Sequence, residues 1–256
     1  MKKIALIPAR VESKRFHGKL LEKLSGVPVI IRTYQSAIKA NLFDDVFVVT
    51  HNNQIIDLMK SINGKYLKSS SNHESGTDRI AEVAIDLKHD IIVNLQGDAP
   101  LTPPWVINQL VSELENSNYQ VATPVFKCDD VGLKNLLRDR KLGRVGATTV
   151  VFDNNHMALY FSKEVLPYIN DKEINNKRTL VYHHIGVYAY TAPALLSYLK
   201  LPPSVLENQE GLEQLRFIEN SIPVKCIVSS LNGKEFWELN NPSDVKKIEE
   251  ILKDNF

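Results

Sequence analysis

Short apolar runs alternate with longer segments of helical periodicity through the first half of the chain. The apolar runs are β-branched and bounded by polar or turn residues, which is typical of buried strands; they cover 4–7, 46–50, 91–95 and 121–126. The segments between them carry apolar residues every three or four positions, as amphipathic helices do; they cover 29–40, 54–62, 78–87 and 106–114. This alternation predicts an α/β fold with a mostly parallel central sheet and helices on both faces.

The second half of the chain is less regular. Its pattern predicts strands at 147–152, 184–190 and 222–228, and helices at 210–219 and 243–252. The polar stretch 170–178 is expected to form an exposed loop or lid. We therefore predict one domain over 1–256 with a smaller, less regular inserted subregion at about 150–201.

Composition excludes several classes of protein. The 256 residues are 43% hydrophobic and 24% charged, as in an ordinary soluble domain. A net charge of +1 disfavours a nucleic-acid partner. Cys128 and Cys226 have no Cys or His at metal-ligand spacing, so neither a zinc site nor a disulfide framework is indicated. The apolar run at the N-terminus is too short for a signal peptide, and no stretch is long enough for a membrane span. We expect a cytoplasmic protein with no membrane partner.

A basic loop follows the first predicted strand. It contains one hydroxyl, one glycine and four cations, namely Ser13, Gly18, Arg10, Lys14, Arg15 and Lys19. In an open α/β sheet, ligands bind at the carboxyl ends of the strands, so this loop is placed to meet an anion. A solvated basic loop without a ligand is the alternative interpretation.

A second polar group follows the predicted strand 91–95. Asp98 comes three residues after this strand, so its carboxylate is expected at the same edge of the sheet as the basic loop. A carboxylate that holds Mg²⁺ opposite a cationic loop is what metal-assisted phosphoryl or nucleotidyl transfer requires. An Asp in an ordinary Gly-Asp turn is the alternative.

Three further segments have both structural and functional interpretations. The small residues Ser75 and Gly76 precede a predicted helix, where they can serve a helix cap or leave room for a flat ligand such as a nucleobase. The segments 184–188 and 212–216 place polar side chains among apolar ones, which suits either structural hydrogen bonds or a polyhydroxylated ligand.

Taken in order, these segments resemble the 3-deoxy-manno-octulosonate cytidylyltransferases, the CMP-Kdo synthetases. The resemblance runs over nearly the whole chain, from the Ile-Pro-Ala-Arg block to Pro242, and rests on blocks at 7–10, 18–19, 75–79, 94–98, 158–162, 184–188 and 212–216. It implies a nucleotide-diphospho-sugar transferase-like fold whose inserted subregion serves dimerisation and sugar binding. It also implies that CMP passes from CTP to the anomeric hydroxyl of an acidic sugar, Kdo or a related ulosonic acid, for lipopolysaccharide or capsule-type polysaccharide synthesis. Members of the family are commonly homodimers, so a homodimer is expected.

The resemblance also implies roles for individual residues. Arg10 and Lys19 would bind the triphosphate and Asp98 would hold Mg²⁺, so these three are the predicted catalytic residues. The predicted CTP-binding residues are Ala9, Ser13, Arg15, Ser75, Gly76 and Gln96. The predicted sugar-binding residues are His184, Tyr188, Glu213, Gln214 and Lys163.

The chain departs from the family pattern in its predicted metal and sugar contacts. Asn240 stands where the family has a second metal-binding Asp, and an amide oxygen can still bind Mg²⁺ but brings no charge. Lys163 and Asn170 stand where the family has arginines near the sugar carboxylate, and neither offers a bidentate fork. His17 and Ala99 replace the usual Pro and Glu. These changes lead to the hypothesis that CTP use is retained while the acceptor differs from Kdo.

Two other functions stay open at this point. One is a nucleotide-sugar-binding homologue with weakened or lost catalysis, which the Asn240 replacement motivates. The other is a nucleotidyltransferase with another acceptor or nucleotide.

Overall fold

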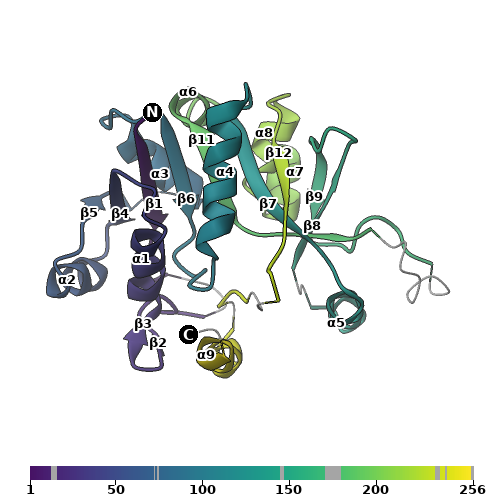
Figure 1. Ribbon diagram of the computed structural model, residues 1–256, viewed down its shortest axis with the longest axis horizontal. Helices are drawn as coiled ribbons and strands as arrows, with labels where there is room; N and C mark the ends of the chain where they lie inside the picture. The colour runs from purple at the N-terminus through teal and green to yellow at the C-terminus, as the bar shows by residue number, and fades with distance from the viewer. Residues whose placement is uncertain are drawn as a thin grey trace.

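The largest element of the fold is a mixed β-sheet (Figure 1). The computed structural model describes residues 1–12, 16–71, 73, 75–144, 147–170, 180–233, 237–239 and 241–254. Across the sheet the strands follow the order β5 (Tyr66–Lys68), β4 (Asp45–Thr50), β1 (Lys3–Pro8), β6 (Ile91–Leu95), β11 (Val187–Thr191), β7 (Val121–Lys127), β10 (Tyr182–His184), β8 (Thr148–Phe152) and β9 (Ala158–Ser162), and β12 (Lys225–Ser229) pairs with β7. Strands β5, β4, β1 and β6 pair in parallel, as do β7 and β12, whereas β11 runs antiparallel to β6 and β7. The predicted mostly parallel sheet is confirmed.

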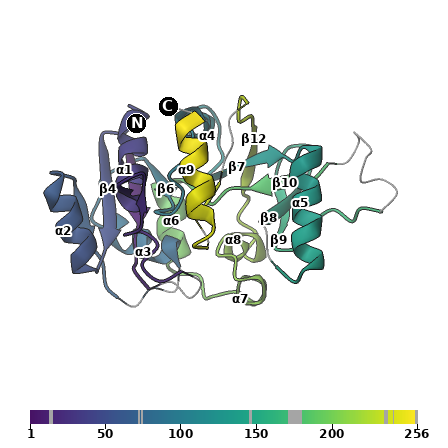
Figure 2. The ribbon, with the colours of Figure 1, turned by 90° about the horizontal axis from the view of Figure 1, so that it is seen from below.

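Helices cover both faces of this sheet, as predicted. Figure 2 shows α4 (Pro104–Asn116) on one side, and α3 (Gly76–Ala84), α7 (Val205–Glu210) and α8 (Leu215–Glu219) on the other, while α9 (Asp244–Asp254) crosses the lower edge of the sheet. Side chains alternate along a strand, and β1 therefore contributes to both cores. Ala5 and Ile7 pack in the core that contains α1 (Val29–Lys39), α2 (Asn53–Ser61) and α4, while Ile4 and Leu6 pack with α3, α6 (Ala192–Tyr198) and α8.

Several short elements were not predicted. A hairpin of β2 (Lys23–Leu24) and β3 (Val27–Pro28) turns through Ser25 and Gly26, whose φ angles are 47° and 82°. Strands β5 and β9 and helices α5 (Asp130–Lys141), α6 and α7 were also missed. Helix α5 has one buried side chain, that of Leu133, so it lacks the apolar periodicity that reveals a helix in sequence.

The predicted helix 210–219 is wrong over its first half. Helix α7 ends at Glu210 because Gly211 adopts a left-handed conformation with φ 62°, a common way to end a helix. The N–H of Leu212 returns to the carbonyl of Glu207 at 3.2 Å, and α8 begins only at Leu215. The predicted strand 184–190 is likewise two strands, β10 and β11, with a break at Ile185 and Gly186.

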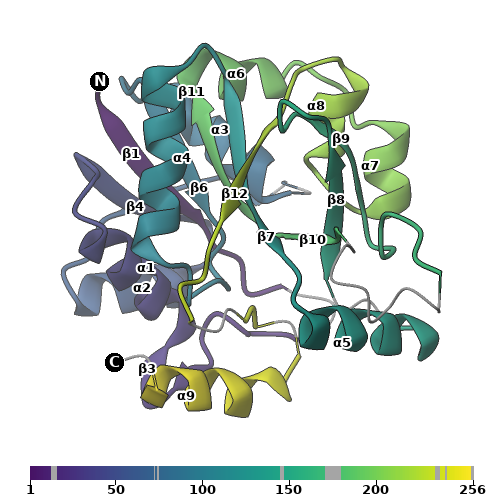
Figure 3. The ribbon, with the colours of Figure 1, turned by 45° about the vertical axis from the view of Figure 1, so that its right-hand side comes forward.

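The irregular part of the second half stands apart from the parallel strands. Strands β8 and β9, with α5 nearby, lie at the opposite end of the molecule from β4 and β5 (Figure 3). Only Asn170 of the predicted loop or lid 170–178 falls within the described residues. No helix in the described part of the chain is long and apolar enough to span a membrane.

Candidate active site

The carboxyl ends of β1 and β6 bring the two chemically important loops together. The two strands pair in parallel, with Leu6 opposite Asn94, so the segment after Pro8 and the segment after Leu95 leave the sheet side by side. Ala9 is buried, and its N–H donates to the carbonyl of Val49 at 2.9 Å. The first residues of the basic loop are thus fixed to β4 before Arg10 turns outward to an exposed position.

Lys19 and Asp98 form an ion pair at this edge. The Asp98 loop is held closely, because a Cβ on Gly97 would lie 3.0 Å from the carbonyl oxygen of Pro8 and 3.2 Å from a methyl group of Leu20. The hydroxyl of Thr33 also donates to the carbonyl of Gly97 at 2.9 Å. The predicted catalytic cation and carboxylate, which come from two loops, are therefore in contact, and the loop of Asp98 packs closely against its surroundings.

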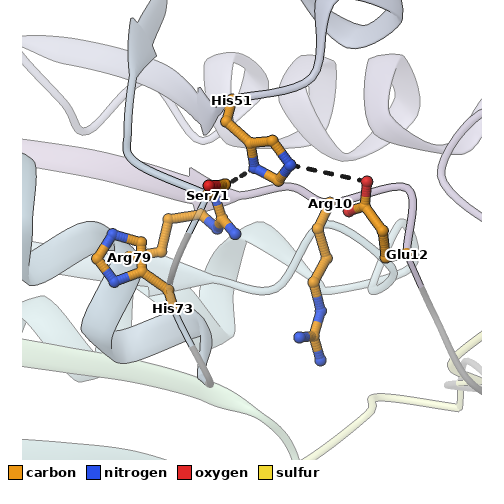
Figure 4. Close-up of a pocket in the computed structure, with 6 residues that line it drawn as sticks. All are labelled: Arg10, Glu12, His51, Ser71, His73 and Arg79. Carbon is orange, nitrogen blue, oxygen red and sulfur yellow. Dashed lines mark hydrogen bonds and ion pairs between the residues drawn. The ribbon is translucent and has the colours of Figure 1, made fainter.

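A pocket of about 310 Å³ opens at the same edge of the sheet, between the ends of β1 and β4 and the start of α3 (Figure 4). Its lining residues are polar or charged, namely Arg10, Glu12, His51, Ser71, His73 and Arg79. Arg79 is 2% exposed, and burial together with the nearby charge of Arg10 lowers its pKa. Two guanidinium groups that face one cavity raise each other's energy, and a bound anion relieves this repulsion.

Hydrogen bonds fix the polar side chains of this pocket. Arg79 Nη1 donates to His51 Nδ1 at 3.0 Å and to Ser69 Oγ at 2.6 Å. Because His51 Nδ1 accepts, its proton is on Nε2, which lies 3.7 Å from Glu12 Oε1. The pKa of Glu12 is lowered by a hydrogen bond from backbone N–H and by His51 and Arg79. The pocket is thus arranged around a fixed arginine.

Two residues from the second half of the chain contribute to the same region. Thr77 N–H donates to Glu213 Oε2 at 3.0 Å, and Gln96 Nε2 donates to Glu213 Oε1 at 3.4 Å. Burial raises the pKa of Glu213. The side-chain nitrogen of Gln214 is buried and has no hydrogen-bond partner among the described residues, which is costly unless a ligand satisfies it. The turn between α7 and α8 therefore joins the predicted sugar residues to the predicted nucleotide residues.

The other predicted sugar residues lie deeper or further away. His184 is 5% exposed and Tyr188 is 2% exposed. His184 Nε2 lies 3.0 Å from Thr123 Oγ1, and burial lowers the pKa of His184 to about 3. Lys163 lies next to Glu210, because its backbone N–H donates to Glu210 Oε2 at 3.0 Å. Burial alone would raise the pKa of Glu210, but its hydrogen bonds and the charge of Lys163 lower it. His184 and Tyr188 are thus enclosed, and their contact with a sugar stays a prediction.

Three predicted residues, Ser13, Arg15 and Asn240, lie outside the described residues. The residue before Asn240 is described: Leu239 is fully buried, and its N–H donates to the carbonyl of Asp98 at 3.2 Å. The C-terminal segment is therefore attached to the loop of the predicted metal ligand.

Asp98 fits a magnesium ligand of the kind that works with a nucleotide. No group of three or more His, Cys, Asp or Glu that could hold a metal occurs in the described part of the chain. Mg²⁺ is commonly held by one or two carboxylates and the phosphates of the substrate. The donor set at Asp98 therefore suits Mg²⁺ that arrives with a triphosphate.

Sequence reasoning missed several residues of the pocket. Arg79 belonged to a segment interpreted as a helix cap, and Glu12, His51, Ser71 and His73 received no role. A positional signal was available for His51, because it directly follows β4 and strand ends at this edge bind ligands. Nothing in the sequence around Ser71 and His73 indicates that they line the pocket.

Comparison with known proteins agrees with this geometry. The sequence profile of the cytidylyltransferase family matches residues 4–228. The chain is 38% identical to the 3-deoxy-manno-octulosonate cytidylyltransferase of Flavobacterium johnsoniae, over 99% of this chain and 100% of the relative. It is 36% identical to the protein of the same name from Chloroherpeton thalassium, over 98% of each chain. A solved structure of CMP:2-keto-3-deoxy-manno-octonic acid synthetase complexed with CTP covers 100% of both chains, with a TM-score of 0.85 and 28% identity. The chain therefore belongs to the cytidylyltransferase family and, within it, to the 3-deoxy-manno-octulosonate cytidylyltransferases.

Proposed function

We propose that this protein transfers CMP from CTP to 3-deoxy-manno-octulosonate (Kdo) and releases pyrophosphate. The observation that carries the proposal is the contact of Lys19 with Asp98, at the same strand-end edge as a pocket lined by Arg10 and Arg79. This arrangement supplies fixed positive charge and one carboxylate at a strand end, as nucleotidyl transfer needs. The related structure with bound CTP supports the choice of nucleotide.

In the reaction, the anomeric hydroxyl oxygen of Kdo attacks the α-phosphorus of CTP. The bond from this phosphorus to the oxygen that bridges to the β-phosphorus breaks, pyrophosphate leaves, and the proton of the attacking hydroxyl passes to solvent. Arg10 and Lys19 bind the phosphates and stabilise the charge that grows on the leaving group. Asp98 would hold Mg²⁺, which would neutralise part of the charge of the phosphates.

The sugar would approach from the side of the α7–α8 turn. Gln214 offers a buried amide nitrogen without a partner among the described residues, and a hydroxyl or carboxylate of the sugar would satisfy it. Lys163 brings a positive charge to the same part of the chain, beside Glu210. Because Glu210 already neutralises part of this charge, Lys163 would bind the carboxylate of Kdo less strongly. Related ulosonic acids are therefore tested as alternative acceptors.

The test is pyrophosphate release in the presence of CTP and Mg²⁺ with Kdo and with a panel of related ulosonic acids. We expect turnover with Kdo, and the Asp98→Asn variant should bind CTP but lose most of this turnover. Turnover with another ulosonic acid and not with Kdo would support the altered-acceptor hypothesis instead. CTP binding without turnover on any acceptor would indicate a binding protein that has lost catalysis.

A homodimer is the second part of the proposal. Strand β9 ends the order of the sheet, and the exposed side chains of Leu159, Tyr168 and Leu180 lie on β9 or in segments of the same subregion. Exposed apolar side chains in one subregion suit an interface with a second copy. Light scattering on the purified protein should give twice the mass of the chain, and Leu159→Lys should shift it toward the monomer. A monomer at assay concentrations would contradict this part.

A further inference from the structure

The C-terminal helix α9 holds the turn of the β2–β3 hairpin. Glu249 Oε1 accepts the N–H of Ser25 at 2.5 Å. Ser25 and Gly26 form this turn with φ angles of 47° and 82°, and a left-handed conformation is unfavourable for serine. Arg32 of α1 also donates to the carbonyl of Leu24 at 2.9 and 2.6 Å. Hydrogen bonds from α9 and α1 therefore stabilise a turn that is unfavourable by itself.

The hairpin in turn belongs to the segment that carries Lys19. The carbonyl of Leu20 accepts the N–H of Ile30 at 3.1 Å. The carbonyl of Glu22 accepts the N–H of Val29, at the start of α1, at 2.9 Å. Leu20 is 3% exposed, so both the backbone and the side chains of this segment are held. Lys19 comes directly before Leu20, and a displacement of the hairpin would therefore move Lys19.

The same helix also holds the loop of Asp98. Lys247 Nζ lies 3.5 Å from the centre of the Trp237 ring, where a cation is attracted to the face of an aromatic ring. Two residues after Trp237, the N–H of the buried Leu239 donates to the carbonyl of Asp98 at 3.2 Å. The next residue of α9, Ile248, is fully buried in the same core as Leu239. Figure 3 shows this helix beside the hairpin, so one helix contacts the segments of both catalytic partners.

We propose that α9 is a clamp that holds the segments of Lys19 and Asp98 at a fixed separation, with Glu249 as its positioning residue. The proposal rests on the function proposed above and adds a residue that acts on the reaction through Lys19. Groups that stabilise a transition state must be placed accurately, and a displacement of about 1 Å can cost about 10²-fold in rate. Because Glu249 holds the hairpin turn and not Lys19 itself, its effect on the rate passes through the hairpin.

The variants Glu249→Ala and Glu249→Gln test this role. The alanine variant loses the acceptor of the Ser25 N–H, and we expect kcat for pyrophosphate release to fall ~10–100-fold with the KM for Kdo unchanged. The glutamine variant keeps a side-chain oxygen that can accept this N–H, so it should retain most of the kcat. The matched control is Glu250→Ala, since Glu250 is the exposed neighbour on the same helix, and its kcat should be unchanged. If Glu249→Ala lowers Tm but leaves kcat unchanged, Glu249 is merely structural; this result would overturn the inference and leave the proposed function standing.

Hydrogen exchange of the unmodified protein covers the case in which Glu249→Ala does not fold. If α9 holds both loops, CTP that binds the held loops must stabilise α9 in return. With Mg²⁺ and CTP at about 100 times its Kd, this linkage can slow exchange by up to about 100-fold, and we expect exchange of the α9 amides to slow at least ~10-fold. Slower exchange confined to the loops of Lys19 and Asp98 would overturn the inference. Protection of α9 by CTP without CMP-Kdo formation would instead contradict the proposed function and leave this inference standing.

Discussion

Arg216 is the buried charge on which the arrangement around α3 depends, and its removal gives a measurable loss of stability. It is 3% exposed and donates to Glu207 at 2.7 and 2.6 Å and to Asp78 at 3.0 Å. Its guanidinium also lies 4.1 Å from the centre of the Tyr198 ring. Burial alone would lower the pKa of Arg216, but the hydrogen bonds with Glu207 and the charge of Asp78 outweigh this and raise it. The guanidinium is therefore charged and held by two carboxylates.

Arg216→Met keeps an apolar chain of similar length and leaves two carboxylates without their cation. The loss of one partner from a buried ionic network costs about 3–5 kcal/mol. For a chain of this size 1 kcal/mol corresponds to roughly 2–4 °C in Tm, so we expect the midpoint to fall by about 6–20 °C. Thermal and urea unfolding followed by circular dichroism measure this.

The control makes the same substitution at an exposed pair. The side chains of Arg140 and Glu164 are 47% and 49% exposed, and exposed pairs contribute about 0–1 kcal/mol. Arg140→Met should therefore change the midpoint by a few degrees at most. If the Arg216→Met protein were as stable as the Arg140→Met protein, burial would not make the ion pairs of Arg216 stronger than the exposed pair.

Three further predictions follow from other parts of the structure. Lys19→Met should lower kcat for pyrophosphate release by about 10²–10³-fold, because it removes a fixed cation from the leaving group; a change in KM alone, in steady-state assays, would contradict this role. Gly97→Ala should cost about 1–3 kcal/mol in urea unfolding, since its Cβ would lie 3.0 Å from the Pro8 carbonyl oxygen; an unchanged midpoint would show that the loop can yield. His184 has a pKa of about 3 in the folded protein against 6.5 without burial, so the unfolded chain binds more protons between these values. Stability should thus be complete above pH 6.5 and fall on acidification toward pH 3, and His184→Gln should reduce this slope by up to ~1.4 kcal/mol per pH unit; equal slopes in the two proteins would contradict the buried neutral histidine.

The first half of the fold was predictable because its pattern is local. The strand at 91–95 and the helix at 29–40 match β6 and α1 almost to the residue, since each carries its periodicity within its own sequence. The segment 210–219 failed for a different reason. Its apolar residues Leu212, Leu215 and Phe217 have helical spacing, but Leu212 lies in the turn after Gly211, whose left-handed backbone ends α7, and α8 begins only at Leu215.

Some residues of the candidate site could likewise be predicted from the sequence, and others could not. The meeting of the basic loop with Asp98 was predicted because strand ends in a parallel sheet lie at one edge, and the resemblance to the family singled out Arg10 and Lys19 within that loop. Arg79 and His51 were missed because their contact joins α3 to the end of β4, and nothing in either segment alone indicates the other. Glu213 was predicted to bind a sugar, yet its hydrogen bonds go to Thr77 and Gln96. Long-range pairing of this kind is fixed by the fold and not by local sequence.

We propose that the site at the carboxyl ends of β1 and β6 transfers CMP from CTP to Kdo. Phosphorus NMR of the purified protein with CTP, Mg²⁺ and Kdo tests it most directly, because the reaction replaces the three triphosphate signals by one phosphodiester and pyrophosphate. We expect both products to appear together, neither to appear without Kdo, and Asp98→Asn to form little of either. An unchanged CTP spectrum, or the appearance of CDP and inorganic phosphate in place of the phosphodiester, would contradict it.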